Sequence, residues 1–91
     1  MSTIDDEKHR RALVLRLKRI EGQLRAIQAM IGKGDDCERI VQQISASRHA
    51  LDKAFFNVLA CAMQAEPEGS RAKVPAEARL RHAAELLAKF G

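Results

Sequence analysis

Apolar residues recur along the first third of the chain at alternating intervals of four and three. They are Leu13, Leu17, Ile20, Leu24, Ile27 and Ile31. This heptad-like spacing is typical of a helix that packs along a coiled-coil or bundle seam. Gly32 and Gly34 follow the last of these residues, and both are expected to end the helix by adopting a positive φ. The pattern therefore predicts a first helix over about residues 5–32.

The same rhythm resumes after a short polar turn. Its members are Ile40, Ile44, Ser47, Leu51, Phe55 and Val58. They predict a second helix over about residues 37–66, which Asp35 or Asp36 can cap. Val41, Ala54 and Leu59 flank this line, so the helix is apolar over more than one face. A single helical hairpin cannot cover so wide an apolar surface, and self-association is the expected solution.

A break and a shorter third helix complete the pattern. Pro67 and the segment 68–70 end the second helix, and Pro75 is expected in the first turn of a helix over about residues 76–90. No stretch alternates between apolar and polar residues as a strand does. The 91 residues suit one small domain, residues 1–91. The predicted fold class is all-α, with a three-helix protomer.

Composition narrows the setting in which the protein works. No apolar run reaches the roughly 18 residues that a membrane-spanning helix needs, and the charged N-terminus lacks the apolar core of a signal peptide. The chain has two cysteines, too few for a disulfide scaffold. We therefore expect a cytoplasmic protein without a membrane partner.

The net charge of +4 is concentrated in the first predicted helix. Its basic residues between positions 8 and 25 are Lys8, Arg10, Arg11, Arg16, Lys18, Arg19 and Arg25, and the one acid among them is Glu21. Such a basic stripe indicates a polyanionic partner. The alternative is a solvated face on a helical protein-interaction module that does not bind DNA. No nucleophile elbow, glycine-rich phosphate loop or HExxH motif occurs, so the chain is not expected to be an enzyme.

Cys37 and Cys61 lie near opposite ends of the second predicted helix. Twenty-four helical residues separate them by roughly 36 Å, too far for a disulfide within one straight helix. Two antiparallel copies crossing near His49 would bring Cys37 of one chain beside Cys61 of the other. Cys37 follows a polar turn, where exposure and the helix dipole favour a thiolate, although Asp35 and Asp36 oppose it. Packing alone can account for Cys61.

Two segments carry a family resemblance: "RLKRIEGQLR" at residues 16–25, and Cys37 followed by "QQISASR" at residues 42–48. Through them the chain resembles the CsoR/RcnR/FrmR family of bacterial transcriptional repressors over about residues 8–66. The resemblance implies an antiparallel homodimer, a flat homotetramer, and operator DNA binding that ends when an inducer meets Cys37. By motif position it also implies that DNA contacts come from Arg16, Lys18, Arg19 and Arg48.

The resemblance leaves the inducer open. Ser2, Ala62 and Glu66 stand where the aldehyde, nickel, cobalt and copper sensors of the family carry functional residues. The persulfide-sensing, CstR-like branch looks closest, so we rank first a reactive-sulfur sensor built on a Cys37–Cys61′ interchain dithiol, with no required cofactor. The alternative is a metal-responsive repressor that holds Cu(I) or another soft metal at the same cysteines.

Overall fold

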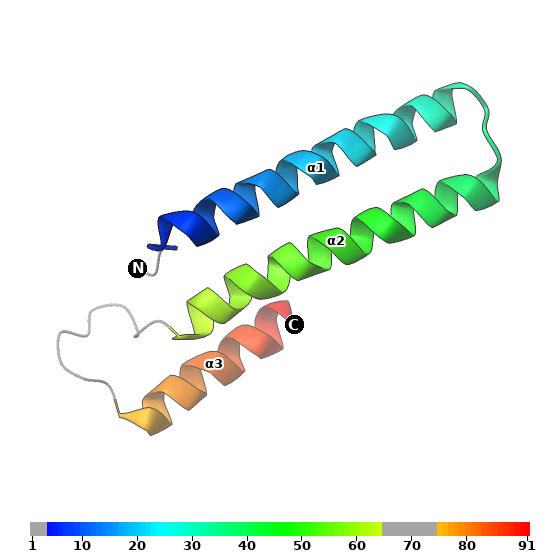
Figure 1. Cartoon of the computed structure of the whole chain (residues 1–91). Coiled ribbons are helices and arrows are strands. Elements are labelled where there is room, and N and C mark those ends of the chain that lie inside the picture. Colours follow the sequence, from blue (N-terminus) through cyan, green and yellow to red (C-terminus); the bar gives the residue numbers. More distant parts are fainter. Residues whose placement is uncertain (1–3, 65–74) are drawn as a thin grey trace. The chain divides into compact units, whose positions relative to one another are not determined.

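The computed structural model describes residues 4–64 and 75–91, which form three helices: α1 (Glu7–Gly32), α2 (Cys37–Gln64) and α3 (Ala76–Phe90) (Figure 1). The all-α prediction is confirmed. α1 begins at Glu7 rather than near residue 5, because the Asp6 side chain accepts a hydrogen bond from the Lys8 N–H (3.0 Å) and so caps the helix. The predicted end of the second helix at residue 66, and the break at Pro67 and residues 68–70, lie outside the described residues.

The chain divides into two compact units. The first unit contains α1 and the part of α2 that ends at Phe55, and the second contains the rest of α2 and α3. Within the first unit, α1 and α2 run antiparallel and are joined by a short turn (Figure 1).

The turn after α1 is a Schellman motif. The Asp35 N–H donates to the Met30 carbonyl (2.9 Å), and the Gly34 N–H donates to the Ile31 carbonyl (3.1 Å). Gly34 supplies the left-handed residue that this motif requires, with φ of 71°. Gly32 instead remains helical as the last residue of α1, so the prediction that it also adopts a positive φ was wrong. One left-handed residue is enough to reverse the chain here.

Asp36 caps α2 and thereby makes Cys37 its first residue. The Arg39 N–H donates to Asp36 Oδ2 (3.2 Å), the bond expected from the third helical position to an N-cap. Asp35 supports the cap, since its Oδ1 accepts from the Asp36 N–H (2.7 Å) and from the Arg39 guanidinium (3.2 Å). Of the two residues that the sequence left open as the cap, Asp36 is therefore the N-cap of α2, and Asp35 stabilises it through hydrogen bonds.

Pro75 lies one position earlier than predicted. It is the N-cap of α3, with φ of −57° and ψ of 145°, rather than a residue of the first turn. Its extended ψ leaves the helix to begin at Ala76, and its carbonyl accepts from the N–H groups of Ala78 (3.0 Å) and Arg79 (3.2 Å). The fixed φ of proline suits either position.

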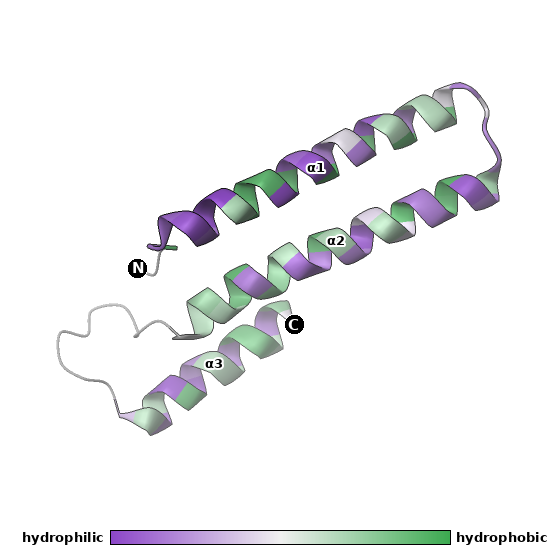
Figure 2. Cartoon of the chain, in the orientation of Figure 1, coloured by the Kyte–Doolittle hydropathy of each residue, from purple (hydrophilic) through white to green (hydrophobic). Residues whose placement is uncertain are grey.

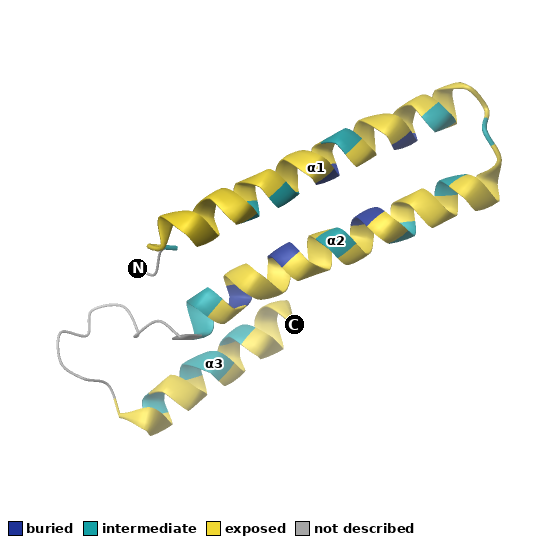
Figure 3. Cartoon of the chain, in the orientation of Figure 1, coloured by how far each residue is buried: buried dark blue, intermediate teal, exposed yellow. Residues whose placement is uncertain are grey.

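Four buried residues mark the seam of the first unit (Figure 3). Ile20 and Ile27 lie seven residues apart on α1, and Ser47 and Ala54 lie seven residues apart on α2. The other half of the predicted α1 line is exposed: Leu17 by 38%, Leu24 by 47% and Ile31 by 57%. Only one of the two interleaved apolar lines of α1 therefore faces α2.

Several exposed apolar residues of the first unit gather on one side of the hairpin, whereas Val14, Leu15 and Val41 are exposed farther around the helices. On an ideal helix, Leu17 and Leu24 lie about 40–60° from Ile20, and Ile44 and Leu51 lie about 40–60° from Ser47 in the same rotational sense. Since the two helices are antiparallel, both stripes lie on the same side. We call this side the apolar face and define it by Leu17, Leu24, Ile31, Ile44, Leu51 and Phe55, all exposed. Figure 2 shows that α1 starts with hydrophilic residues and that hydrophobic residues recur along α1 and α2.

The second unit is also thinly packed. Leu59 is its buried hydrophobic residue among those described, whereas Leu80, Leu87 and Phe90 of α3 are exposed. Every helix within residues 4–64 and 75–91 is too short or too polar to cross a bilayer.

The two glycines of the turn give a matched test of the Schellman motif. We expect Gly34→Ala to lower the free energy of unfolding by about 1–2 kcal/mol, because an L-residue is strained in the left-handed region. Gly32→Ala should instead raise it by about 0.5–1 kcal/mol, since Gly32 is helical. An added Cβ meets no atom within 4 Å at either position, so sterics do not interfere. Urea denaturation measures the free energy of unfolding of both variants. A change of the same sign in the two variants would contradict the assignment of Gly34 as the left-handed residue of the Schellman motif.

Candidate functional site

The basic residues of α1 lie on more than one side of the helix. Arg16 is about 40° and Arg19 about 100° from Ile20, both turned away from the apolar face. Lys18 is about 160° from Ile20 and therefore lies on the outer surface. Arg16 is half-buried at the seam, whereas Lys18 and Arg19 are exposed. Arg16 and Arg19 thus share one edge of the hairpin, which we call the basic edge.

Arg48 lies elsewhere on the hairpin. It is exposed and about 100° from Ser47 in the direction of the apolar face. The hairpin therefore does not bring Arg48 together with Arg16 within one chain. A single surface that includes all four predicted DNA contacts would need basic residues from more than one copy.

The predicted DNA-binding cations are not neutralised within the part of the chain that the structure describes. Among residues 4–64 and 75–91, no acidic side chain forms an ion pair with any of the four. Other arginines are paired at helical spacing: Arg11 with Glu7 (3.0 Å) and Arg39 with Asp35 (3.2 Å). The four unneutralised charges remain available to a phosphate backbone.

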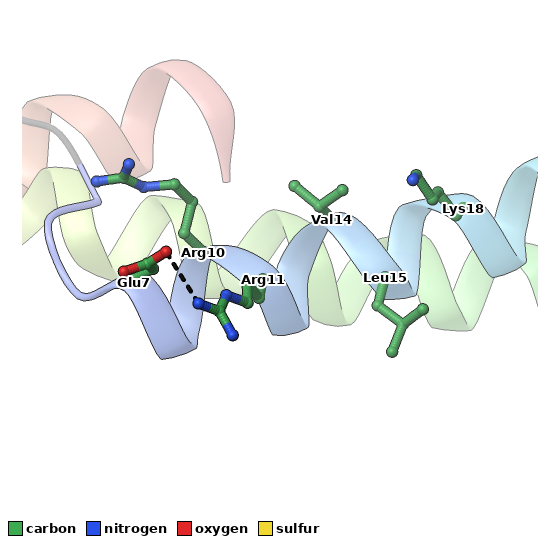
Figure 4. A pocket seen from close by; sticks show the side chains of 6 residues that line it. All are labelled: Glu7, Arg10, Arg11, Val14, Leu15 and Lys18. Atoms are coloured by element: carbon green, nitrogen blue, oxygen red, sulfur yellow. Dashed lines mark hydrogen bonds and ion pairs between the residues drawn. The ribbon is translucent and has the colours of Figure 1, made fainter.

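A shallow hollow of about 440 Å³ extends the basic surface along the start of α1 (Figure 4). Its lining comes from α1 and consists of Glu7, Arg10, Arg11, Val14, Leu15 and Lys18. Arg10 and Arg11 belong to the basic run in the sequence but were not among the predicted DNA contacts.

Cys37 is exposed at the beginning of α2. On an ideal helix it lies about 80° from Ser47, in the direction of Ile44 and Phe55, and so on the side of the apolar face. A partner that covers this face would therefore approach the thiol. The neighbouring carboxylates of Asp36 and Glu38 add negative charge beside it.

Cys61 occupies a different side of α2. It is half-buried and continues the line of Ser47 and Ala54 at the same seven-residue interval. Relative to Cys37 it is rotated by about 120° on an ideal helix, whereas Ala62 lies within about 20° of the Cys37 direction. This spacing supports the packing role for Cys61 that the sequence left open beside the dithiol role.

A complete metal site is not formed within the described part of one chain. Residues 4–64 and 75–91 contain no group of three or more His, Cys, Asp or Glu side chains placed to hold an ion. Of the histidines, His9 is paired with Asp6 (2.8 Å), His49 is exposed and His82 is half-buried. A metal bound at Cys37 would therefore take further ligands from outside the described part of this chain.

Residues 9–89 match the family model for metal-sensitive transcriptional repressors. The match covers most of the chain, so the protein belongs to this family, in agreement with the resemblance of its first two helices to CsoR/RcnR/FrmR repressors. The family consists of transcriptional repressors and is not a class of enzymes. Searches among curated proteins and among solved structures returned no match.

The family description bears on the inducer. Its metal sensitivity is closer to the metal-responsive alternative than to the reactive-sulfur interpretation, which nothing in the match supports. The match also does not single out the persulfide-sensing branch.

Proposed function

We propose that this protein represses transcription by binding operator DNA and releases that DNA when Cu(I) binds at Cys37. One observation carries the proposal: the chain belongs to a family of metal-sensitive repressors, and Cys37 offers an exposed thiol at the start of α2. The unneutralised cations on the same hairpin support DNA as the partner. Arg16, Lys18, Arg19 and Arg48 are the proposed contacts.

The donor atoms favour Cu(I) among the metals. Thiolates are soft ligands and select soft ions, whereas a structural zinc site usually takes four protein ligands. The two ligands proposed here are Cys37 and the partner's Cys61. Two thiolates without a third described donor suit Cu(I) better than Zn(II).

The exposed apolar face supports self-association, which would gather the DNA-binding cations of several chains and bring a partner toward Cys37. The apolar face exposes Leu51 by 50% and Ile31 by 57% in the single chain, and an exposed apolar surface of this kind marks an interaction site. We propose an antiparallel homodimer through this face and a flat homotetramer of two dimers. A tetramer carries four times the net charge of +4, which is +16, and so strengthens binding to DNA.

A second candidate is a repressor that responds to reactive sulfur. The observation in its favour is the donor set itself, because a dithiol needs no third ligand and none is assembled in the described ranges. In this mechanism the Cys37 thiolate takes one sulfur atom from a polysulfide, which leaves one sulfur shorter. The partner's Cys61 thiolate then attacks the Cys37 persulfide, so that an interchain disulfide forms and HS⁻ is released.

The DNA-binding assignment is tested by replacing single arginines. We expect Arg16→Ala and Arg48→Ala each to weaken operator binding and to flatten its salt dependence by about one phosphate contact. Fluorescence anisotropy at several salt concentrations measures both quantities. Arg39→Ala is the matched control, because Arg39 is already paired with Asp35. Affinity that is unchanged in the first two variants would refute the assignment, and a wild-type protein without saturable binding would favour an interaction module.

A further inference from the structure

One buried polar contact crosses the seam between α1 and α2. Ser47 is 5% exposed and is the buried polar residue of the described chain. Its Oγ donates to Gln23 Oε1 at 3.2 Å. No buried side-chain nitrogen or oxygen among residues 4–64 and 75–91 lacks a hydrogen-bond partner, so this contact satisfies the Ser47 hydroxyl.

The contact forms a polar layer in an otherwise apolar seam. Gln23 lies three residues after Ile20 and four before Ile27, and these two isoleucines are the buried residues of α1. If α1 moved by one turn along α2, an isoleucine would replace Gln23 opposite Ser47. The buried Ser47 hydroxyl would then lose its acceptor, which costs free energy. Gln23 itself is exposed, so the pair is only part-buried, but a single polar pair at a helix seam can specify the register of two helices in this way.

The register matters because of what each helix carries. Gln23 lies about 60° from Ile20 on the same side as Arg16 and Arg19, so the contact adjoins the basic edge. α2 carries Cys37 ten residues before Ser47. A slip of one helical turn would shift the basic edge by about 5.4 Å relative to α2, more than the 3.4 Å rise between nucleotides of one DNA strand.

We propose that Gln23 and Ser47 are positioning residues that hold the basic edge of α1 in register with α2 and so set the affinity for DNA. The inference rests on the proposed function, since it concerns the same DNA-binding surface. Neither residue need touch DNA. Their contact keeps Arg16 and Arg19 at a fixed spacing from α2, which also bears the apolar face and Cys37.

The test compares Ser47→Ala and Gln23→Leu with the wild-type protein by fluorescence anisotropy on operator DNA. Each variant should weaken binding roughly three- to tenfold, the effect expected for one neutral hydrogen bond. The double variant should bind no more weakly than either single variant, because both changes remove the same contact. Ser45→Ala and Gln42→Leu, both about 140–160° from Ser47 on the outer side of α2, are the matched controls and should bind as the wild-type protein does.

Thermal unfolding and light scattering separate positioning from simple stabilisation. A positioning role predicts weaker binding by variants that keep the wild-type melting temperature within a few degrees and the wild-type mass. Additive losses in the double variant, or wild-type affinity in Ser47→Ala, would overturn the inference while leaving DNA binding by the protein intact. If the wild-type protein itself does not bind DNA, the proposed function and this inference both fail.

Discussion

The Cys37→Ser variant is expected to bind operator DNA as the wild-type protein does and to remain bound when Cu(I) is added. Serine preserves the size of the side chain and leaves the Asp36 cap of α2 in place, but it removes the soft thiolate that selects Cu(I). Anisotropy of labelled operator DNA, followed during an anaerobic Cu(I) titration, measures the effect. Release of DNA from Cys37→Ser at wild-type Cu(I) concentrations would contradict the sensor role.

Cys61→Ala separates the two roles of the second cysteine. If the partner's Cys61 is the second thiolate, this variant should lose most of its response to Cu(I). If Cys61 only packs along the line of Ser47 and Ala54, it should respond as the wild-type protein does, with a small loss of stability. The same variant exposed to polysulfide tests the second candidate, in which the interchain crosslink to Cys37 disappears.

Leu51→Glu is expected to dissociate the assembly and to abolish tight DNA binding. Leu51 is 50% exposed in the single chain and lies within the apolar face, where a partner chain would bury it. An unpaired charge buried in an interface costs about 3–5 kcal/mol, and a two-fold dimer would bury two of them. The dissociation constant should therefore rise by more than about a hundredfold. Size-exclusion chromatography with light scattering measures the mass.

Leu51→Met is the control for this substitution. Methionine keeps the volume and apolar character of the side chain, so assembly should persist. A Leu51→Glu protein with the same mass as the wild-type protein would show that the apolar face is not the interface. A wild-type protein that is monomeric at micromolar concentration would contradict the proposed assembly as a whole.

Local signals in the sequence were enough to predict the helices. The acidic caps, the left-handed glycine and the proline each act over one turn of chain, so their effects can be read without tertiary structure. Gly34 and Asp36 show this directly, since the first ends α1 and the second begins α2. Gly32 shows the limit, because the sequence cannot rank two glycines two residues apart when a single left-handed residue is enough to end the helix.

The seam could not be assigned from spacing alone. The line of Leu13, Ile20 and Ile27 and the line of Leu17, Leu24 and Ile31 have the same period and similar hydrophobicity. Only the packing of α1 against α2 shows that Ile20 and Ile27 are buried and that Leu24 is exposed. The contact between Gln23 and Ser47 could not be predicted from the sequence either, because a single polar pair between two helices does not change the spacing of the apolar residues.

The sequence was enough to predict candidate residues for the site. It was not enough to predict which of them lie on the same side of the hairpin. A count of charges identifies the basic run of α1, and Cys37 stands out at a helix start. The sequence does not show that Arg48 lies toward the apolar face while Arg16 lies on the basic edge. That separation depends on the rotation of both helices about the seam.

The most direct test of the central claim is anisotropy of labelled DNA from upstream of the protein's own gene, titrated first with the wild-type protein and then with Cu(I). The account predicts saturable, salt-sensitive binding, followed by release as Cu(I) fills a site that needs Cys37. Binding that never saturates, or a complex that Cu(I) leaves intact, would contradict it. Release by polysulfide but not by Cu(I) would replace the metal with reactive sulfur as the inducer.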